Sequence, residues 1–477
     1  MGLRASLLVT LLAAGCSVGP NYVRPTAPAP AEFKEASGWK VAEPRDEAMR
    51  GPWWTIYDDP ALAALEAAVE EANQNLVAAE ARFREARALV SAARATWYPT
   101  VTLGVSATRS RTSDNLSSVQ GFSGRTRSDF AMPLSINWEA DVWGRIRRQV
   151  ESREASAQAS AADFASTRLS LQAELATDYF RLRTLDAQRR LLGATVEAYA
   201  KSLELTRNRY TGGVASRADV VQAETLLAST QAQAIDLGVE RAQTEHAIAV
   251  LTGKSPAELS LANAPLDGAP PDVPPGVPAA LLERRPDVAA AERRVAAANA
   301  EIGVAVAAYF PTVQLSASGG FESNDIAKWL VWPSRFWSFG PAVSETVFDG
   351  GARGALTAQA RATYDETVAV YRQSTLAAFQ QVEDALAALR VLEDEGRVQT
   401  EAVTSAREAV RIITNQYKAG ITSYLDVVTT ETTALTNERT AVDILGRRLA
   451  ASVFLVQSLG GGWRTDDLPP RHDLAAD

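Results

Sequence analysis

The chain has 477 residues, a formal net charge of −9 and a single cysteine. The acidic balance argues against nucleic-acid binding, and one cysteine cannot form an internal disulfide. No internal apolar run reaches the ~18 residues that a membrane-spanning helix needs, which excludes an inner-membrane helix bundle.

The first fifteen residues have the pattern of a secretory signal peptide. Arg4 precedes the apolar residues 7–12, and small residues then lead to Cys16. We predict a signal peptide over 1–15 and a covalent lipid on Cys16 after cleavage; an ordinary signal with an incidental cysteine is the alternative. Ser17 behind the cysteine favours release to the outer membrane. Residues 16–60 then form a tether that is rich in Pro and Ala at first; the family resemblance described below implies that its end is the start of an equatorial region.

A long helix next runs into a strand through an aromatic-proline junction. The helical pattern over 80–96 ends at Trp97, Tyr98 and Pro99, and apolar residues then alternate with polar ones. A polar loop over 110–128 separates this strand from a second one, which contains Pro133. We assign residues 61–253 to a first repeat, with two strands at about 98–139.

The same event recurs later in the chain. A helix begins at Pro286, reaches Tyr309, Phe310 and Pro311, and again gives way to alternation. Residues 207–225 also align without gaps on residues 414–432. We therefore predict a second repeat over 279–462, with strands at about 309–347. A proline-rich linker over 254–278 separates the repeats, and a polar, loosely ordered tail follows over 463–477.

Aromatic side chains gather at the ends of the predicted strands, which alternate over about 10 residues, as in membrane β-barrels. A soluble sandwich would also alternate but would not need aromatic residues at both ends. Four strands cannot close a barrel, because barrels need roughly eight or more strands and an open edge cannot lie in lipid. Several chains must therefore share one barrel.

The remaining segments predict very long helices. Residues 141–208 contain no proline and would span on the order of 100 Å. Returning helices are expected over 219–251 and 426–459. The first long helix carries apolar residues at alternating three- and four-residue steps, which predicts coiled-coil packing: Leu171, Leu175, Leu182, Leu185, Leu192, Val196, Tyr199, Leu203 and Tyr210.

Several motifs resemble the TolC-like outer-membrane efflux factor family, in its lipoprotein branch. They are the segment from Cys16 to Pro25, the segment 282–287 (LERRPD), and Phe310-Pro311-Thr312. The resemblance covers the chain from Cys16 to about Gly462. It implies a homotrimer with a twelve-stranded outer-membrane barrel continuous with a periplasmic α-helical barrel. It also implies service as the exit duct of a tripartite pump, with a periplasmic adaptor and an RND-type inner-membrane transporter as partners.

Two turns between the long helices are the candidate sites. Each turn has a tyrosine, a glycine, a serine, and an aspartate three residues after that serine: Tyr210, Gly213, Ser216 and Asp219, and Tyr417, Gly420, Ser423 and Asp426. The serines suit helix N-caps. The resemblance further implies that these turns form a constricted entrance and meet the adaptor, with Asp426 in an acidic ring. Thr429 stands where the family has a second ring aspartate, and Gln416 replaces a basic residue beside Tyr417.

Catalytic chemistry is not expected. His246 and His472 lack metal-ligand spacing. The glycine segments 212–213 and 460–462 lack the Lys and Ser or Thr of a phosphate loop. We therefore expect no enzyme, no metal and no cofactor apart from the lipid. Two other functions are considered: the exit duct of a type I protein-secretion system, and a periplasmic coiled-coil adaptor. The lipoprotein start argues against the first, and the strand pairs argue against the second.

Overall fold

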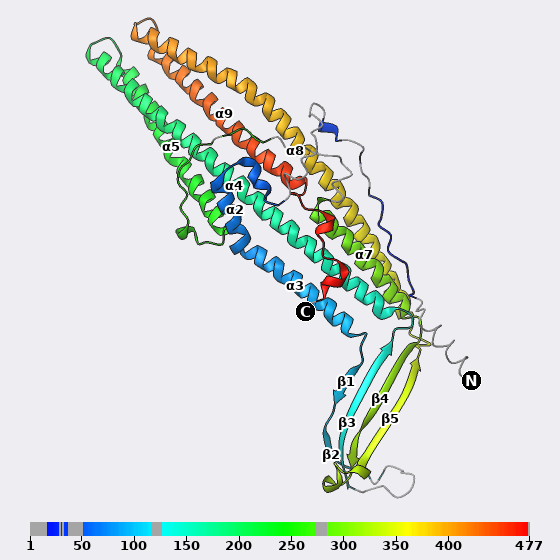
Figure 1. The fold of residues 1–477 in the computed structure, drawn as a ribbon. Helices are drawn as coiled ribbons and strands as arrows, with labels where there is room; N and C mark the ends of the chain where they lie inside the picture. Colours follow the sequence, from blue (N-terminus) through cyan, green and yellow to red (C-terminus); the bar gives the residue numbers. More distant parts are fainter. Residues whose placement is uncertain are drawn as a thin grey trace.

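The computed structural model describes residues 17–27, 30, 33–36, 51–113, 115, 126–266, 268–271 and 284–475. The predicted signal peptide and Cys16 lie outside these residues. The molecule is elongated, with a small sheet at one end and long helices running away from it (Figure 1).

Two helices of 67 residues dominate the fold, as expected from the proline-free segments. Each is followed by a helix of 35 residues that returns alongside it. At ~1.5 Å per residue the longer helices span about 100 Å. No helix in the described part of the chain is both long and apolar enough to cross a membrane. The helices are α2 (Pro60–Ala72), α3 (Gln74–Ala95), α4 (Arg145–Thr211), α5 (Arg217–Leu251), α7 (Pro286–Ala307), α8 (Ala352–Lys418) and α9 (Tyr424–Ser458).

The two halves of the chain repeat one order of elements: helix, strands, long helix, returning helix. The strands are β1 (Thr100–Leu103), β2 (Ser106–Arg111), β3 (Thr126–Ala140), β4 (Thr312–Ser323) and β5 (Arg335–Ser344). All are antiparallel in the order β1-β3-β4-β5, and β2 also pairs with β3. Because β1 and β2 follow one another along β3, the described residues form four lines of strand with a free edge at each side.

The two faces of the sheet differ in polarity. One row across the four lines consists of Thr102, Ser135, Ser318 and Ser338, which are paired in register. The other face presents exposed apolar side chains: Val101, Leu103, Leu134, Ile136, Trp337, Phe339 and Val343. The predicted alternation is therefore present, and its apolar face is uncovered in the single chain.

A proline in the interior of the sheet has a glycine beside it in each neighbouring line of strand. Pro133 of β3 lies opposite Gly320 of β4, where an added Cβ would come 2.0 Å from the carbonyl oxygen of Met132. On its other side, the N–H of Gly104 donates to the carbonyl of Pro133 at 2.9 Å, between β1 and β2. Proline lacks an N–H donor, and the pairing with β3 is interrupted here between Leu103 and Ser106 while that with β4 continues.

The main apolar core lies midway along the helices. It joins α2 and the 3₁₀ helix Trp53–Tyr57 to α4, α8 and α9. Trp53 is almost fully buried and its indole N–H donates to Gln172 at 3.3 Å. Leu62, Leu175 and Leu455 are wholly enclosed there. This core forms the equatorial region and holds the two helical hairpins together at their middle.

The two ends of the chain are docked along the helices. The extended N-terminal segment is held by hydrogen bonds from Asn299 to the carbonyl of Pro20 and from the N–H groups of Lys34 and Glu35 to Glu383. The expectation of a loosely ordered tail is wrong for residues 463–475. Leu474 is fully buried, and Arg94 donates to the carbonyl of Arg471 at 2.6 Å.

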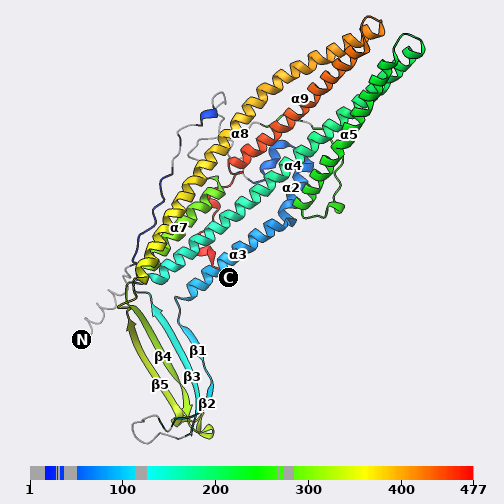
Figure 2. The ribbon, with the colours of Figure 1, turned by 180° about the vertical axis from the view of Figure 1, so that it is seen from behind.

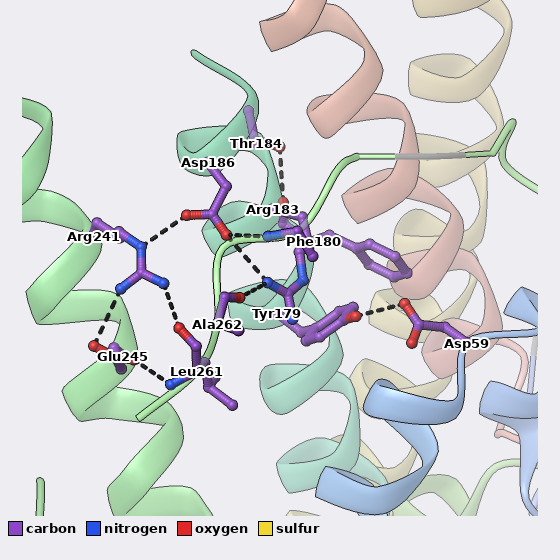
Figure 3. Close-up of polar contacts among 11 residues, drawn as sticks. Asp59, Tyr179, Phe180, Arg183, Thr184, Asp186, Arg241, Glu245, Leu261 and Ala262 are labelled. Carbon is purple, nitrogen blue, oxygen red and sulfur yellow. Dashed lines mark hydrogen bonds and ion pairs between the residues drawn. The ribbon is translucent and has the colours of Figure 1, made fainter. Parts of the chain in front are cut away.

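A buried ionic network ties the start of the inter-repeat linker to α4 and α5 (Figure 3). Asp186 accepts from Arg183 at 3.1 Å and from Arg241 at 2.7 Å. The two arginines also donate to the carbonyls of Ala262 and Leu261, at 2.8 and 2.7 Å. Asp186 thus pairs with both arginines, and Glu245 pairs with Arg241 as well at 3.2 Å, while the arginines hold the linker main chain.

Candidate functional site at the ends of the helical hairpins

The predicted sites lie on two turns at the end of the molecule opposite the sheet, as Figure 1 and Figure 2 show from both sides. One turn joins α4 to α5 and the other joins α8 to α9. Gly213 and Gly420 have φ of 73° and 76°, a left-handed backbone that favours glycine. These two glycines therefore allow each long helix to reverse within a few residues.

Both returning helices start with a capping box. In the first turn, the N–H of Asp219 donates to Ser216 Oγ at 3.1 Å, and the N–H of Ser216 donates to Asp219 at 2.8 Å. Ser423 and Asp426 repeat the arrangement, at 3.3 and 3.1 Å. The N-cap interpretation of the serines is confirmed. Two N–H groups at each helix start are satisfied in this way.

Asp426 has more hydrogen-bond donors than Asp219. The hydroxyl of Thr422 donates to its carboxylate at 2.6 Å, and the hydroxyl of Ser423 donates at 2.7 Å. Alanine occupies the position equivalent to Thr422 in the first turn, at Ala215. The hydrogen bonds from Thr422 and then Ser423 lower the pKa of Asp426 below its ordinary value. This exposed side chain is a stable negative charge at the tip.

The two tyrosines of the turns lie in different surroundings. Tyr417 is 5% exposed and its ring packs against Tyr424, with centroids 5.4 Å apart. Tyr210 is 43% exposed, although the coiled-coil register predicted that it would be covered. The register fails at this last position because Tyr210 is the next-to-last residue of α4, beyond the apolar cluster that covers Leu203.

Arg209, which belongs to neither of the two predicted sets of turn residues, connects the two hairpins. The guanidinium of Arg209 lies over the ring of Tyr417, 4.7 Å from its centroid, and Nη1 donates to the carbonyl of Lys418 at 3.0 Å. Arg209 occupies the position equivalent to Gln416 in the other repeat. The lack of a basic residue at position 416 therefore pointed to this contact, because Arg209 of the first repeat packs on Tyr417 in its place.

Apolar side chains from both hairpins form one cluster below the turns, here named the tip cluster. It consists of Leu203, Val220, Ala223, Tyr417, Tyr424 and Val427. The four helices therefore pack as one unit up to their ends. Two of the predicted residues, Tyr417 and Gly420, lie against the first hairpin, where they meet the tip cluster and Arg209. Tyr210 remains at the surface. In the described residues no three His, Cys, Asp or Glu side chains are grouped as metal ligands would be.

Comparison with known proteins agrees with this architecture. The sequence profile of the family described as "Outer membrane efflux protein" matches residues 64–254 and 277–461. The solvent efflux pump outer membrane protein SrpC of Pseudomonas putida is 33% identical over 461 residues, 96% of this chain and 97% of that protein. Outer membrane protein OprJ of Pseudomonas aeruginosa is 29% identical, with 96% and 95% covered.

Solved structures give the same result. The outer-membrane channel OprN superposes with a TM-score of 0.88 at 32% identity, over 94% of this chain and 100% of that chain. The profile spans well over half of the sequence, in two blocks that each contain a long hairpin. The chain therefore belongs to the outer membrane efflux protein family and is an outer-membrane efflux channel component with a large periplasmic helical part.

Proposed function

We propose that three copies of this chain assemble into the passive exit duct of a tripartite efflux pump. In this proposal a periplasmic adaptor and an RND-type inner-membrane transporter supply the energy, and the duct exports small molecules. The chain itself performs no chemistry and needs no cofactor beyond a lipid on Cys16.

The free edges of the sheet are the observation that carries the proposal. Four lines of strand have an exposed apolar face and two unpaired edges. Hydrocarbon cannot satisfy the N–H and C=O groups of an open edge, and barrels need about eight or more strands. Three chains supply twelve lines, in which each β1/β2 edge pairs with the β5 edge of a neighbour.

The long helices also expose apolar side chains in the single chain. Ile235 and Val239 on α5, and Leu356 and Val391 on α8, are exposed large apolar residues. Side chains of this kind favour contact with further helices rather than with water. Neighbouring copies would cover them and continue the helical wall into a tube.

The turns suit the periplasmic entrance of this duct. Around a three-fold axis, Asp426 would place three like charges close together in a narrow neck, where screening by water is weak. Arg209 would hold the two hairpins of each copy together in the closed form. Gly213, Ser216, Gly420 and Ser423 lie on the outermost turns, where an adaptor would make contact.

The names of the relatives indicate a substrate class. They include solvent, toluene and antibiotic efflux pump outer membrane proteins. We propose small, largely apolar molecules as the cargo here. Cells that lack their own outer-membrane efflux proteins should regain export of an apolar fluorescent dye when this chain is produced with its adaptor and transporter. Continued dye accumulation in cells with a correctly inserted duct would contradict this assignment.

Native mass spectrometry in mild detergent tests the assembly. The expected mass is that of three mature chains, and circular dichroism of the same sample should show the strands of the sheet. A stable monomer with full strand content would contradict the shared-barrel argument. A trimer that forms only through its lipid would also contradict it, so Cys16→Ala is measured beside the wild type.

A further inference from the structure

One glutamate occupies equivalent positions in the two repeats but has opposite surroundings. Glu224 on α5 pairs with Arg207 on α4 at 2.8 Å, with both side chains substantially exposed. Its counterpart 207 positions later is Glu431 on α9, and the residue equivalent to Arg207 is Thr414. The second repeat thus keeps the carboxylate and lacks the arginine that would neutralise it.

Glu431 lies instead in the seam between α9 and α4. Its Oε2 is buried without a hydrogen-bond partner, and the same is true of the hydroxyl of Tyr199 on α4. One turn or two nearer the tip, Ser202 and Tyr424 join the same two helices through their hydroxyls at 3.3 Å. The pKa of Tyr199 is raised first by burial and then by the charge of Glu431, so the two groups are close.

The groups around this carboxyl do not supply a compensating charge. Tyr199 faces it from α4, and Tyr424 and Glu438 lie near Tyr199 on α9. Tyr417 of α8 adjoins Tyr424, while Glu438 is itself paired with Arg407 of α8. Burial raises the pKa of Glu431 from its ordinary 4.5 to about 7. A charged carboxylate is thus disfavoured in the packed seam and a neutral carboxyl is tolerated.

We propose that Glu431 is a proton-responsive latch, whose neutral form keeps the ends of the two hairpins packed and whose ionised form favours their separation. The role in opening the duct rests on the proposed function. The latch itself rests on Oε2 of this carboxyl, which is buried at the seam without a hydrogen-bond partner, and on the loss of its arginine relative to the first repeat.

The direction of the pH effect follows from linkage. In a separated seam Glu431 would be solvated and titrate near 4.5, whereas in the packed seam it titrates near 7. Between these values the packed form holds the proton more tightly, so raising the pH weakens packing over that interval. Above about 7 both forms are ionised and the effect levels off. Each pKa unit of difference is a tenfold change in the ratio of the two forms.

Hydrogen exchange of the purified trimer measures the latch directly. Amides in the first turns of α9, residues 424–435, should lose protection by about fiftyfold between pH 5 and pH 7.5, after correction for intrinsic exchange. In Glu431→Gln, which stays neutral, protection should remain high and independent of pH. Glu224→Gln is the matched control and should keep the wild-type pH dependence. Wild-type pH dependence in Glu431→Gln would overturn the proposal.

A second variant guards against a general packing defect. Tyr199→Phe keeps the ring and removes a hydroxyl that has no hydrogen-bond partner, so Glu431 and the pH dependence of protection should remain. Loss of the pH dependence in Tyr199→Phe, where Glu431 is intact, would overturn the proposal. Single-channel conductance in planar bilayers is recorded in the same buffers. A protein that forms no channel contradicts the proposed function, whereas the exchange data decide the latch in either case.

Discussion

Arg209 of the first repeat lies over the ring of Tyr417 of the second, with its guanidinium carbon 4.7 Å from the ring centroid. The same side chain donates to the carbonyl of Lys418. This contact joins the ends of two hairpins that are 200 residues apart in sequence. An arginine is suited to it because its planar guanidinium can stack on a ring and donate a hydrogen bond at once.

Arg209→Gln should weaken the closed entrance. Cation–π contacts contribute about 1 kcal/mol, so the ratio of open to closed channels should rise on the order of fivefold. Planar-bilayer recordings would show more frequent or larger openings at low voltage. Arg207→Gln is the control, because Arg207 pairs with Glu224 inside its own hairpin. Equal effects of the two variants would show that Arg209 has no special role.

Asp426→Asn should weaken cation selectivity and any block by divalent cations. The helix start should survive, because asparagine still accepts hydrogen bonds and Ser423 remains the N-cap. Asp219→Asn should change conductance less. The lowered pKa keeps Asp426 charged below the ordinary 3.8, so selectivity should persist as the pH is lowered to about 4. Unaltered selectivity in a properly assembled Asp426→Asn trimer would leave the residue with a helix-start role only.

Cys16 should be lipidated. Labelled palmitate should enter the wild type and not Cys16→Ala, and labelling of the variant would refute the assignment. The variant should still remain largely in the outer membrane, because its strands do not depend on the lipid. The N-terminal segment should stay docked as well, since the N–H of Val18 donates to the carbonyl of Trp143 at 3.1 Å.

Gly320→Ala should disrupt pairing between β3 and β4. The new Cβ would press on the carbonyl of Met132, and forced overpacking of this kind costs about 1–3 kcal/mol. The control is Gly340→Ala on β5, where an added Cβ meets nothing within 4 Å. Trimer yield and the thermal denaturation midpoint, followed by circular dichroism, would separate the two. Equal midpoints would show that the sheet can absorb the added methyl group.

Asp186→Ala should destabilise the equatorial region. It leaves the buried Arg183 without its carboxylate and Arg241 with Glu245 alone, and breaking a buried ion pair costs about 3–5 kcal/mol. The control is Glu393→Ala, the equivalent position in the second repeat, where the side chain is exposed. Thermal denaturation should show a lower midpoint only for Asp186→Ala. A midpoint as high as that of the wild type would mean that solvent reaches the arginines.

Local pattern was enough to predict the repeats, the four lines of strand, the long helices and the two serine N-caps. Each depends on neighbours in sequence: the change from a helical to a two-residue period at Pro311, or the three-residue spacing of Ser423 and Asp426. A proline or an N-cap serine sets the conformation of the main chain within a few residues of itself. The same local pattern therefore predicts the same secondary structure in both repeats.

Tertiary structure alone decided which equivalent residues differ in role. Arg209 contacts Tyr417 and Tyr210 remains exposed. Glu431 has a buried, unpartnered oxygen where Glu224 is paired, because α4 packs against α9. Burial and pairing depend on side chains brought together across some 200 residues. No local spacing specifies these contacts, so the asymmetry of the tips and the docking of the C-terminal tail emerge only once the hairpins are packed.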